Sequence, residues 1–214
     1  MNLQALLKAP ALAEEFERLR LDLGARHVAV VGAQGGEGVT TVAARLACAL
    51  APHGRVLLAE GNLRRPALAR ELGLNGPGLL DWDLQGALPT QSLPGFAQLA
   101  VLTAGMASPR ADAPTLPERL AAAAKRAREE HDFVVWDTPA ASRFPDLLAI
   151  SAHCDGVLVV VEMDRSRVDG LQFLRNTLDR AQVRILGSVL NRSGRYWPRT
   201  SRAERAAQSA TATR

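Results

Sequence analysis

The amino-acid sequence predicts an α/β fold of three layers, in which a mostly parallel β-sheet carries helices on both faces. Short apolar runs bounded by turn residues alternate with stretches of helical composition. These runs are apolar throughout, as is typical of strands in a parallel sheet that is covered on both faces. The length of 214 residues suits one well-buried domain and is too short for two ordinary ones.

The elements follow in order along the chain. An amphipathic helix is predicted at residues 11–23, because apolar side chains recur there at helical spacing with charges between them. The predicted strands lie at residues 27–33, 55–61, 99–105, 132–138, 155–163 and 183–191. Further helices are expected at residues 40–51, 116–130 and 168–181. Glycine and proline are frequent between residues 73 and 113, so loops and one short helix are expected there.

Composition divides the chain into three parts. Residues 1–26 hold the N-terminal amphipathic segment, residues 27–192 the α/β domain, and residues 193–214 a basic tail that is expected to be disordered. The net charge of +4 comes from the end of the chain, where residues 191–214 contain six arginines and one glutamate. No apolar run approaches the roughly 18 residues of a membrane span, so a cytoplasmic protein is expected.

A glycine-rich segment, GAQGGEGVTT, connects the first predicted strand to the following helix, and we call residues 32–41 the phosphate loop. Such a turn lets backbone N–H groups converge on a phosphate, and the helix dipole adds to the attraction. The segment therefore predicts a P-loop NTPase-like fold. The candidate nucleotide-binding residues are Gly35, Gly36, Glu37, Gly38, Val39, Thr40 and Thr41.

The phosphate loop departs from the usual pattern G-x-x-x-x-G-K-[ST] at its charged position. In that pattern the lysine neutralises phosphate charge and the hydroxyl holds Mg²⁺. Here Gly38 is followed by Val39 and Thr40, so the hydroxyl is present and the ammonium is absent. Among other cations, Arg64 and Arg65 are expected at the surface or in a subunit contact, and Arg45 is expected to face solvent.

Four collinear motifs resemble the bacterial tyrosine kinases of capsule and exopolysaccharide export, and their relatives, the MinD and ParA type ATPases. The first motif is the phosphate loop with its helix, and the second is VLLAEGNLRRPALARELGL at residues 56–74. The third is FVVWDTPA at residues 133–140, and the fourth runs from DGVLVVVEM to ILGSVLNR. The resemblance extends from Glu14 to Arg192.

This resemblance implies ATP or ADP and Mg²⁺ as cofactors. It implies that Thr40 and Asp137 bind the metal, and that Asn191 lies near the adenine base. The catalytic positions it implies are Glu60, Asn62 and Asp137. Glu60 and Asn62 stand where the kinases have two aspartates, so only Asp137 is unchanged.

Other departures concern subunit contacts and the kinase substrate. Gln34 stands where the MinD and ParA group carries a signature lysine. The N-terminal helix resembles a subunit contact in which Glu14 and Arg20 are kept and Glu17 replaces an arginine, so a homo-oligomer is expected through Glu14 and Arg20. The family's C-terminal tyrosine cluster is reduced to Tyr196.

These losses favour a degenerate kinase, inactive or strongly impaired, that binds ATP weakly if at all. It would act as a regulatory or scaffold partner of a membrane polysaccharide co-polymerase or of an active kinase paralogue, peripheral at the inner membrane. One alternative is an active, divergent tyrosine autokinase. A second is a MinD or ParA type ATPase that binds nucleic acid or membrane. The arginine-rich tail could contact anionic lipid, and nucleic acid is the less favoured partner.

Overall fold

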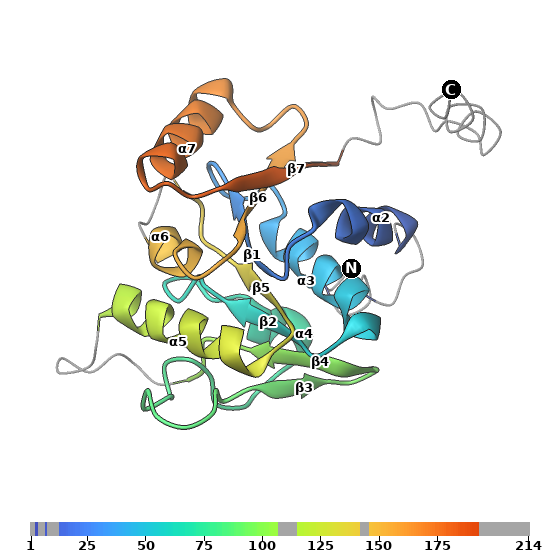
Figure 1. Ribbon diagram of the computed structural model, residues 1–214, viewed down its shortest axis with the longest axis vertical. Helices are drawn as coiled ribbons and strands as arrows, with labels where there is room; N and C mark the ends of the chain where they lie inside the picture. Colours follow the sequence, from blue (N-terminus) through green and yellow to red (C-terminus); the bar gives the residue numbers. More distant parts are fainter. Residues whose placement is uncertain (1–2, 4–6, 8–12, 107–114, 142–145, 193–214) are drawn as a thin grey trace.

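The computed structural model describes residues 3, 7, 13–106, 115–141 and 146–192, and all structural statements concern these residues (Figure 1). The basic tail and Tyr196 lie outside them, as do residues 11 and 12 of the first predicted helix. Within the described ranges, no helix has the length and apolar character needed to cross a membrane. The boundaries of the three predicted parts stay predictions.

A seven-stranded sheet in the order β3-β4-β2-β5-β1-β6-β7 forms the middle layer (Figure 1). Every neighbouring pair is parallel except β3 and β4, which are antiparallel. The mostly parallel sheet that the sequence predicts is therefore confirmed. The strands are β1 (His27–Gly32), β2 (Val56–Glu60), β3 (Gln91–Leu93), β4 (Phe96–Leu102), β5 (Phe133–Asp137), β6 (Gly156–Glu162) and β7 (Ile185–Asn191).

Helices cover both faces of this sheet, which confirms the three layers. Apolar side chains of α2 (Ala13–Leu23), α3 (Val39–Leu50) and α4 (Leu68–Leu72) pack in one core cluster. Those of α5 (Leu116–Glu130), α6 (Asp146–Ser151) and α7 (Val168–Arg180) pack in a second cluster. A short 3₁₀ helix, η1 (Ala51–His53), follows α3.

The central strand β1 explains why the strands read as apolar throughout. Val28 and Val30 belong to the cluster under α3, whereas Ala29 and Val31 belong to the cluster under α5, α6 and α7. Side chains alternate between the two faces of a strand, so a strand between two helical layers needs an apolar residue at every position. All six residues of β1 are buried.

Three local predictions differ from the structure. The expected short helix between residues 73 and 113 is absent from the described part, residues 73–106, where β3 and an earlier start of β4 occur instead. Helix α6 was not predicted. Arg45 does not face solvent: it is buried under α2, with its guanidinium 5.9 Å from the ring centroid of Phe16. The spacing of residues along one helix does not show which of its charged residues a neighbouring helix will cover.

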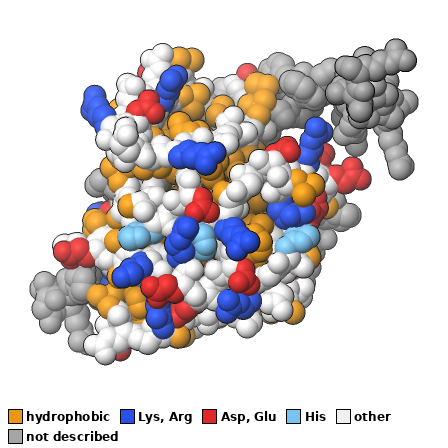
Figure 2. Space-filling model, viewed as in Figure 1, with side chains coloured by type: hydrophobic (Ala, Val, Ile, Leu, Met, Phe, Trp, Pro, Cys, Tyr) orange, Lys and Arg blue, Asp and Glu red, His pale blue; other side chains and the backbone are white. Residues whose placement is uncertain are grey.

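Positive and negative side chains are interspersed over the face seen in Figure 2, with apolar and uncharged groups between them. This face presents no continuous basic patch of the kind that follows a nucleic-acid backbone. That nucleic acid is the less favoured partner stays a prediction, since the basic tail lies outside the described residues.

Candidate functional site

The residues singled out from the sequence gather at one edge of the sheet. The phosphate loop follows β1, Glu60 ends β2, and Asp137 ends β5. Asn191 ends β7, beyond β6 in the sheet. The carboxyl ends of parallel strands share an edge, and ligands of open α/β sheets bind there.

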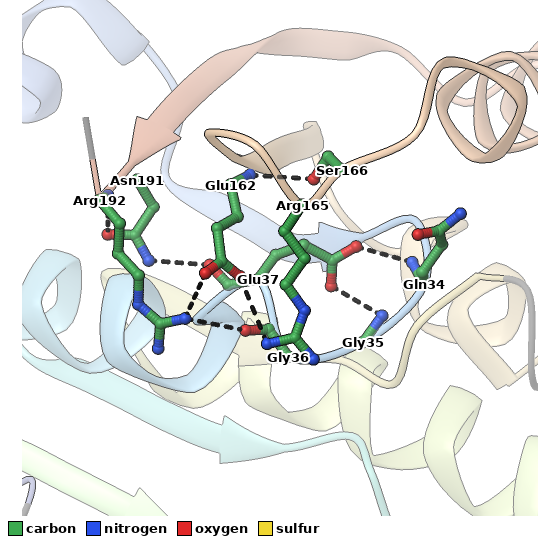
Figure 3. A network of polar contacts seen from close by, with 9 residues as sticks. All are labelled: Gln34, Gly35, Gly36, Glu37, Glu162, Arg165, Ser166, Asn191 and Arg192. Atoms are coloured by element: carbon green, nitrogen blue, oxygen red, sulfur yellow. Dashed lines mark hydrogen bonds and ion pairs between the residues drawn. The ribbon is translucent and has the colours of Figure 1, made fainter. Parts of the chain in front are cut away.

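Glu37 braces the phosphate loop from within. Its carboxylate accepts hydrogen bonds from the backbone N–H groups of Gln34 and Gly35, each at 2.7 Å (Figure 3). The side chain is only 1% exposed. Asn191 holds the loop from the other side, because its side-chain amide donates to the Glu37 carbonyl oxygen at 2.8 Å. These contacts within the chain therefore hold the phosphate loop in its conformation.

Two glycines of the loop adopt a backbone conformation that favours glycine, and each lies against the end of a long or polar side chain. Gly36 and Gly38 both have a φ of 92°, in the left-handed region. A Cβ atom on Gly38 would lie 2.2 Å from the amide nitrogen of Asn191, and one on Gly36 would lie 2.6 Å from Nη2 of Arg165. Helix α3 begins directly after Gly38, with no side-chain cap. Its first N–H groups have no intrahelical partners and suit an anion.

Position 39 contributes apolar surface and no charge. Val39 packs against the cluster under α3, and its Cγ2 would lie 3.0 Å from a Cβ atom on Gly32. Gln34 does not supply the missing cation either: its side-chain amide lies against Gly170 of α7, 2.7 Å from where a Cβ would be. Neither position brings a positive charge to the loop.

Thr40 and Asp137, the two residues proposed to bind metal, lie in direct contact. The Thr40 hydroxyl donates to the Asp137 carboxylate. Burial raises the pKa of Asp137 to about 7, and the hydrogen bond from Thr40 acts in the opposite direction. A hydroxyl and a carboxylate beside a phosphate cradle are the oxygen ligands that Mg²⁺ takes together with substrate phosphates. The donor set therefore fits a Mg²⁺-nucleotide, apart from the absent lysine.

The Glu60 side chain binds the start of α4. Its carboxylate accepts hydrogen bonds from the backbone N–H groups of Ala67 at 3.0 Å and Leu68 at 3.0 Å, at the start of α4. Burial raises the pKa of Glu60 to about 8, and the negative charge of the neighbouring Asp137 adds to this shift. Asn62 is half-buried, and its Oδ1 has no hydrogen-bond partner in the described structure. The second motif thus caps a helix here.

Arg64 and Arg65 are the other candidate cations from the sequence. Arg64 pairs with Asp146 of α6, with 2.9 Å between Nε and Oδ2, and this carboxylate is buried. Arg65 is exposed.

The residues of the predicted subunit contact lie in α2. Arg20 pairs with Glu17 on its own helix at 2.9 Å, and Glu14 is exposed. A homo-oligomer through Glu14 and Arg20 stays a prediction.

Two arginines that the sequence did not single out lie at the phosphate loop. Arg165 follows β6 and Arg192 follows β7, and both guanidinium groups point toward Gly36 (Figure 3). Between them lies Glu162, whose carboxylate pairs with both. The available signal in the sequence was their place directly after two strands that end at the same edge.

Among known proteins, sequence relatives of this chain include bacterial tyrosine kinases. The tyrosine-protein kinase YwqD of Bacillus subtilis is 26% identical over 202 residues, which cover 89% of this chain and 85% of YwqD. EpsB of Ralstonia nicotianae is 28% identical over 177 residues, covering 79% of this chain. The chain spans only 23% of the length of EpsB. No family model matches the sequence.

Solved structures with the same fold include bacterial tyrosine kinase domains and MinD ATPases. The kinase domain of the Escherichia coli tyrosine kinase ETK has a TM-score of 0.74 at 22% identity, covering 88% of this chain and 79% of that chain. MinD of Pyrococcus horikoshii, solved with Mg-ADP, has a TM-score of 0.64 at 26% identity, covering 86% of this chain and 76% of that chain. The P-loop NTPase-like fold predicted from the glycine loop is confirmed.

Proposed function

We propose that this protein retains an adenine nucleotide site but transfers phosphoryl groups poorly, and that it acts as a regulatory or scaffold partner in exopolysaccharide or capsule biosynthesis. The observation that carries the proposal is that the site keeps its binding groups and lacks its catalytic charges. The phosphate loop is braced, and Thr40 contacts Asp137, while Val39 is apolar and Glu60 caps α4.

The nucleotide would be held by the N–H groups at the start of α3, with Thr40 and Asp137 holding Mg²⁺. When bound, Mg²⁺-ATP would supply a transferable phosphoryl group with part of its charge offset. What the chain itself provides is the uncapped N–H groups at the start of α3, beside a loop that Glu37 and Asn191 hold in place. Preorganised donors of this kind cost no rearrangement when the phosphate arrives.

Poor phosphoryl transfer follows from the charges that are missing. Such transfer depends almost wholly on positioning and on stabilising charge at the phosphoryl oxygens. Loss of one preorganised electrostatic group commonly lowers the rate by on the order of 10² to 10³. Asn62 is neutral and cannot accept a proton as a base, and Glu60 is engaged at α4. The expected result is binding with little turnover.

The kind of partner is suggested by a relative in which the matched region is only one part of a longer chain. The succinoglycan biosynthesis transport protein ExoP of Rhizobium meliloti is 29% identical over 180 residues, which are only 22% of its length. In ExoP the matched region is thus one part of a larger transport protein. We propose that this chain contacts a comparable membrane polysaccharide co-polymerase, or an active kinase paralogue, and lies at the cytoplasmic face of the membrane through it.

Two measurements test this proposal together. Calorimetry with Mg²⁺-ATP is expected to show binding, and incubation with labelled ATP is expected to show neither autophosphorylation nor turnover above that of a buffer control. Rapid phosphorylation of Tyr196 would contradict the scaffold role and favour an active autokinase. Salt-sensitive retention on DNA would favour the partitioning type of ATPase.

Restoring the lysine gives a prediction for position 39. The variant Val39→Lys is expected to bind ATP about tenfold more tightly, since one added cation at a phosphate is worth about 1–2 kcal/mol. Its turnover is expected to stay low because Asn62 still lacks a carboxylate. Calorimetry and a phosphate-release assay measure the two effects.

A matched control is Ile185→Lys, since Ile185 is 40% exposed and starts β7, at the end of that strand opposite to Asn191 and the loop. It is expected to bind ATP as the parent does. If the parent protein already turns over ATP as fast as Val39→Lys, the lost lysine does not explain impaired catalysis.

A further inference from the structure

The phosphate loop lacks a cation of its own, yet a guanidinium lies against its central glycine. Nη2 of Arg165 would be 2.6 Å from a Cβ atom on Gly36, and its carbon Cζ 2.9 Å from it. Any side chain at position 36 would displace this group. Arg165 therefore occupies the space directly beside the turn of the loop (Figure 3).

The turn after β6 holds Arg165 in this place. Asp164 has a φ of 61°, in the left-handed region that few residues other than glycine adopt. The turn is closed by Ser166, whose backbone N–H donates to the Glu162 carbonyl at 3.0 Å and whose hydroxyl accepts from the Glu162 N–H at 2.9 Å. The backbone geometry thus directs the side chain after Asp164 toward the loop.

The charge of Arg165 is only partly neutralised. Glu162 is 8% exposed, and its Oε1 accepts a hydrogen bond from Nη1 of Arg192. Its Oε2 lies 3.8 Å from Nη1 of Arg165 and accepts no hydrogen bond in the described structure. Arg192 also reaches the Gly36 carbonyl oxygen, at 3.5 Å. One carboxylate thus faces two guanidinium groups, so Glu162 neutralises Arg165 and Arg192 only in part. The carboxylate of the loop itself, on Glu37, is engaged by backbone N–H groups of the loop.

Arg165 also remains open to a ligand. Its side chain is 59% exposed, although it lies against the loop. A guanidinium presents several N–H donors in a plane and binds phosphate oxygens in pairs. It approaches Gly36 from the β6 side, whereas a lysine at position 39 would reach the same phosphates from the start of α3.

We propose that Arg165 binds the phosphate groups of the nucleotide and so replaces the lysine that position 39 lacks. This inference rests on the proposed function in that it requires a nucleotide at the phosphate loop. It does not require that the protein be a scaffold, because an active enzyme would use the same contact.

Binding of Mg²⁺-ADP, measured by titration calorimetry, tests the proposal. Arg165→Gln is expected to weaken ADP binding at least tenfold, and Arg165→Lys is expected to weaken it less. The matched control is Arg167→Gln, because Arg167 is 73% exposed two residues further on and pairs with Asp169. Its affinity is expected to stay within twofold of the parent.

The double variant Val39→Lys with Arg165→Gln decides whether the arginine stands in for the lysine. Lysine at position 39 is expected to raise ADP affinity more in the Arg165→Gln background than in the parent, which brings the affinity of the double variant to that of the parent or above it. Arg165→Lys serves if Arg165→Gln alone folds poorly. The proposal is overturned if Arg165→Gln binds ADP as the parent does, if the double variant does not recover, or if the parent binds no ADP. Rapid ATP turnover by the parent would instead refute the scaffold role and leave Arg165 as proposed.

Discussion

The free energy of unfolding is expected to fall by about 3 kcal/mol between pH 5 and 8, without nucleotide or Mg²⁺, through Glu60. The Glu60 carboxyl keeps its proton in the folded chain up to a pKa of about 8, against 4.5 for the free group. Between these values the folded state binds more protons than the unfolded state. The contribution of Glu60 to the free energy of unfolding is therefore fully present below about pH 4.5 and is lost as the pH rises toward 8.

Asp137 acts in the same direction, because its pKa is raised to about 7 from 3.8. Carboxyls with lowered pKa values, such as Asp132 beside Arg55, titrate at lower pH and leave this window unaffected. Burial lowers the pKa values of His27 and His131, which act in the opposite direction within this window, so the effect of Glu60 is read from the difference between the parent and Glu60→Gln. Urea denaturation at several pH values measures the effect. In Glu60→Gln the amide oxygen still accepts from Ala67 and Leu68, so its stability should vary much less with pH.

The control for this experiment is Glu118→Gln. Glu118 is an exposed carboxylate whose pKa is lowered by the backbone N–H of Thr115 in a helix cap. The pH dependence of this variant between pH 5 and 8 is expected to match that of the parent. If the stability of Glu60→Gln varies between pH 5 and 8 as that of the parent does, Glu60 is ionised in the fold.

Removing the brace of the phosphate loop is expected to have the second large effect. Glu37→Ala leaves the N–H groups of Gln34 and Gly35 without their carboxylate partner. A hydrogen bond to a charged group contributes about 1.5–3 kcal/mol, so a loss of about 2–4 kcal/mol of stability is expected. Nucleotide affinity is expected to fall at least tenfold, because the loop is no longer held in shape.

Denaturation and calorimetry measure both parts of this prediction. Glu129→Ala is the control, since the Glu129 side chain is 52% exposed and its loss should change stability by no more than about 0.5 kcal/mol. Glu37→Gln keeps one acceptor and is expected to fall between the parent and Glu37→Ala. Tighter nucleotide binding by Glu37→Ala would mean that the carboxylate competes with phosphate for the loop.

Much of the sheet could be predicted because its strands are buried on both faces. The predicted run at 132–138 contains β5, and the run at 155–163 contains β6, since continuous apolar runs leave few alternatives. Helix α5 matches its predicted bounds, where Thr115 and Glu118 form a capping box at its start. The three residues of β3 pair with β4 at the sheet edge, and so short a strand has no period to detect.

The sequence by itself determined the layered fold, the phosphate loop and the valine at its charged position, because each depends on residues that are close along the chain. Only the tertiary structure decided what surrounds that loop. Arg165 and Arg192 are more than a hundred residues from Gly36, and the order β1-β6-β7 brings their strand ends to it. Local sequence patterns predict which residues are buried and where the chain turns. The position of a charge relative to a distant loop depends instead on the order of the strands.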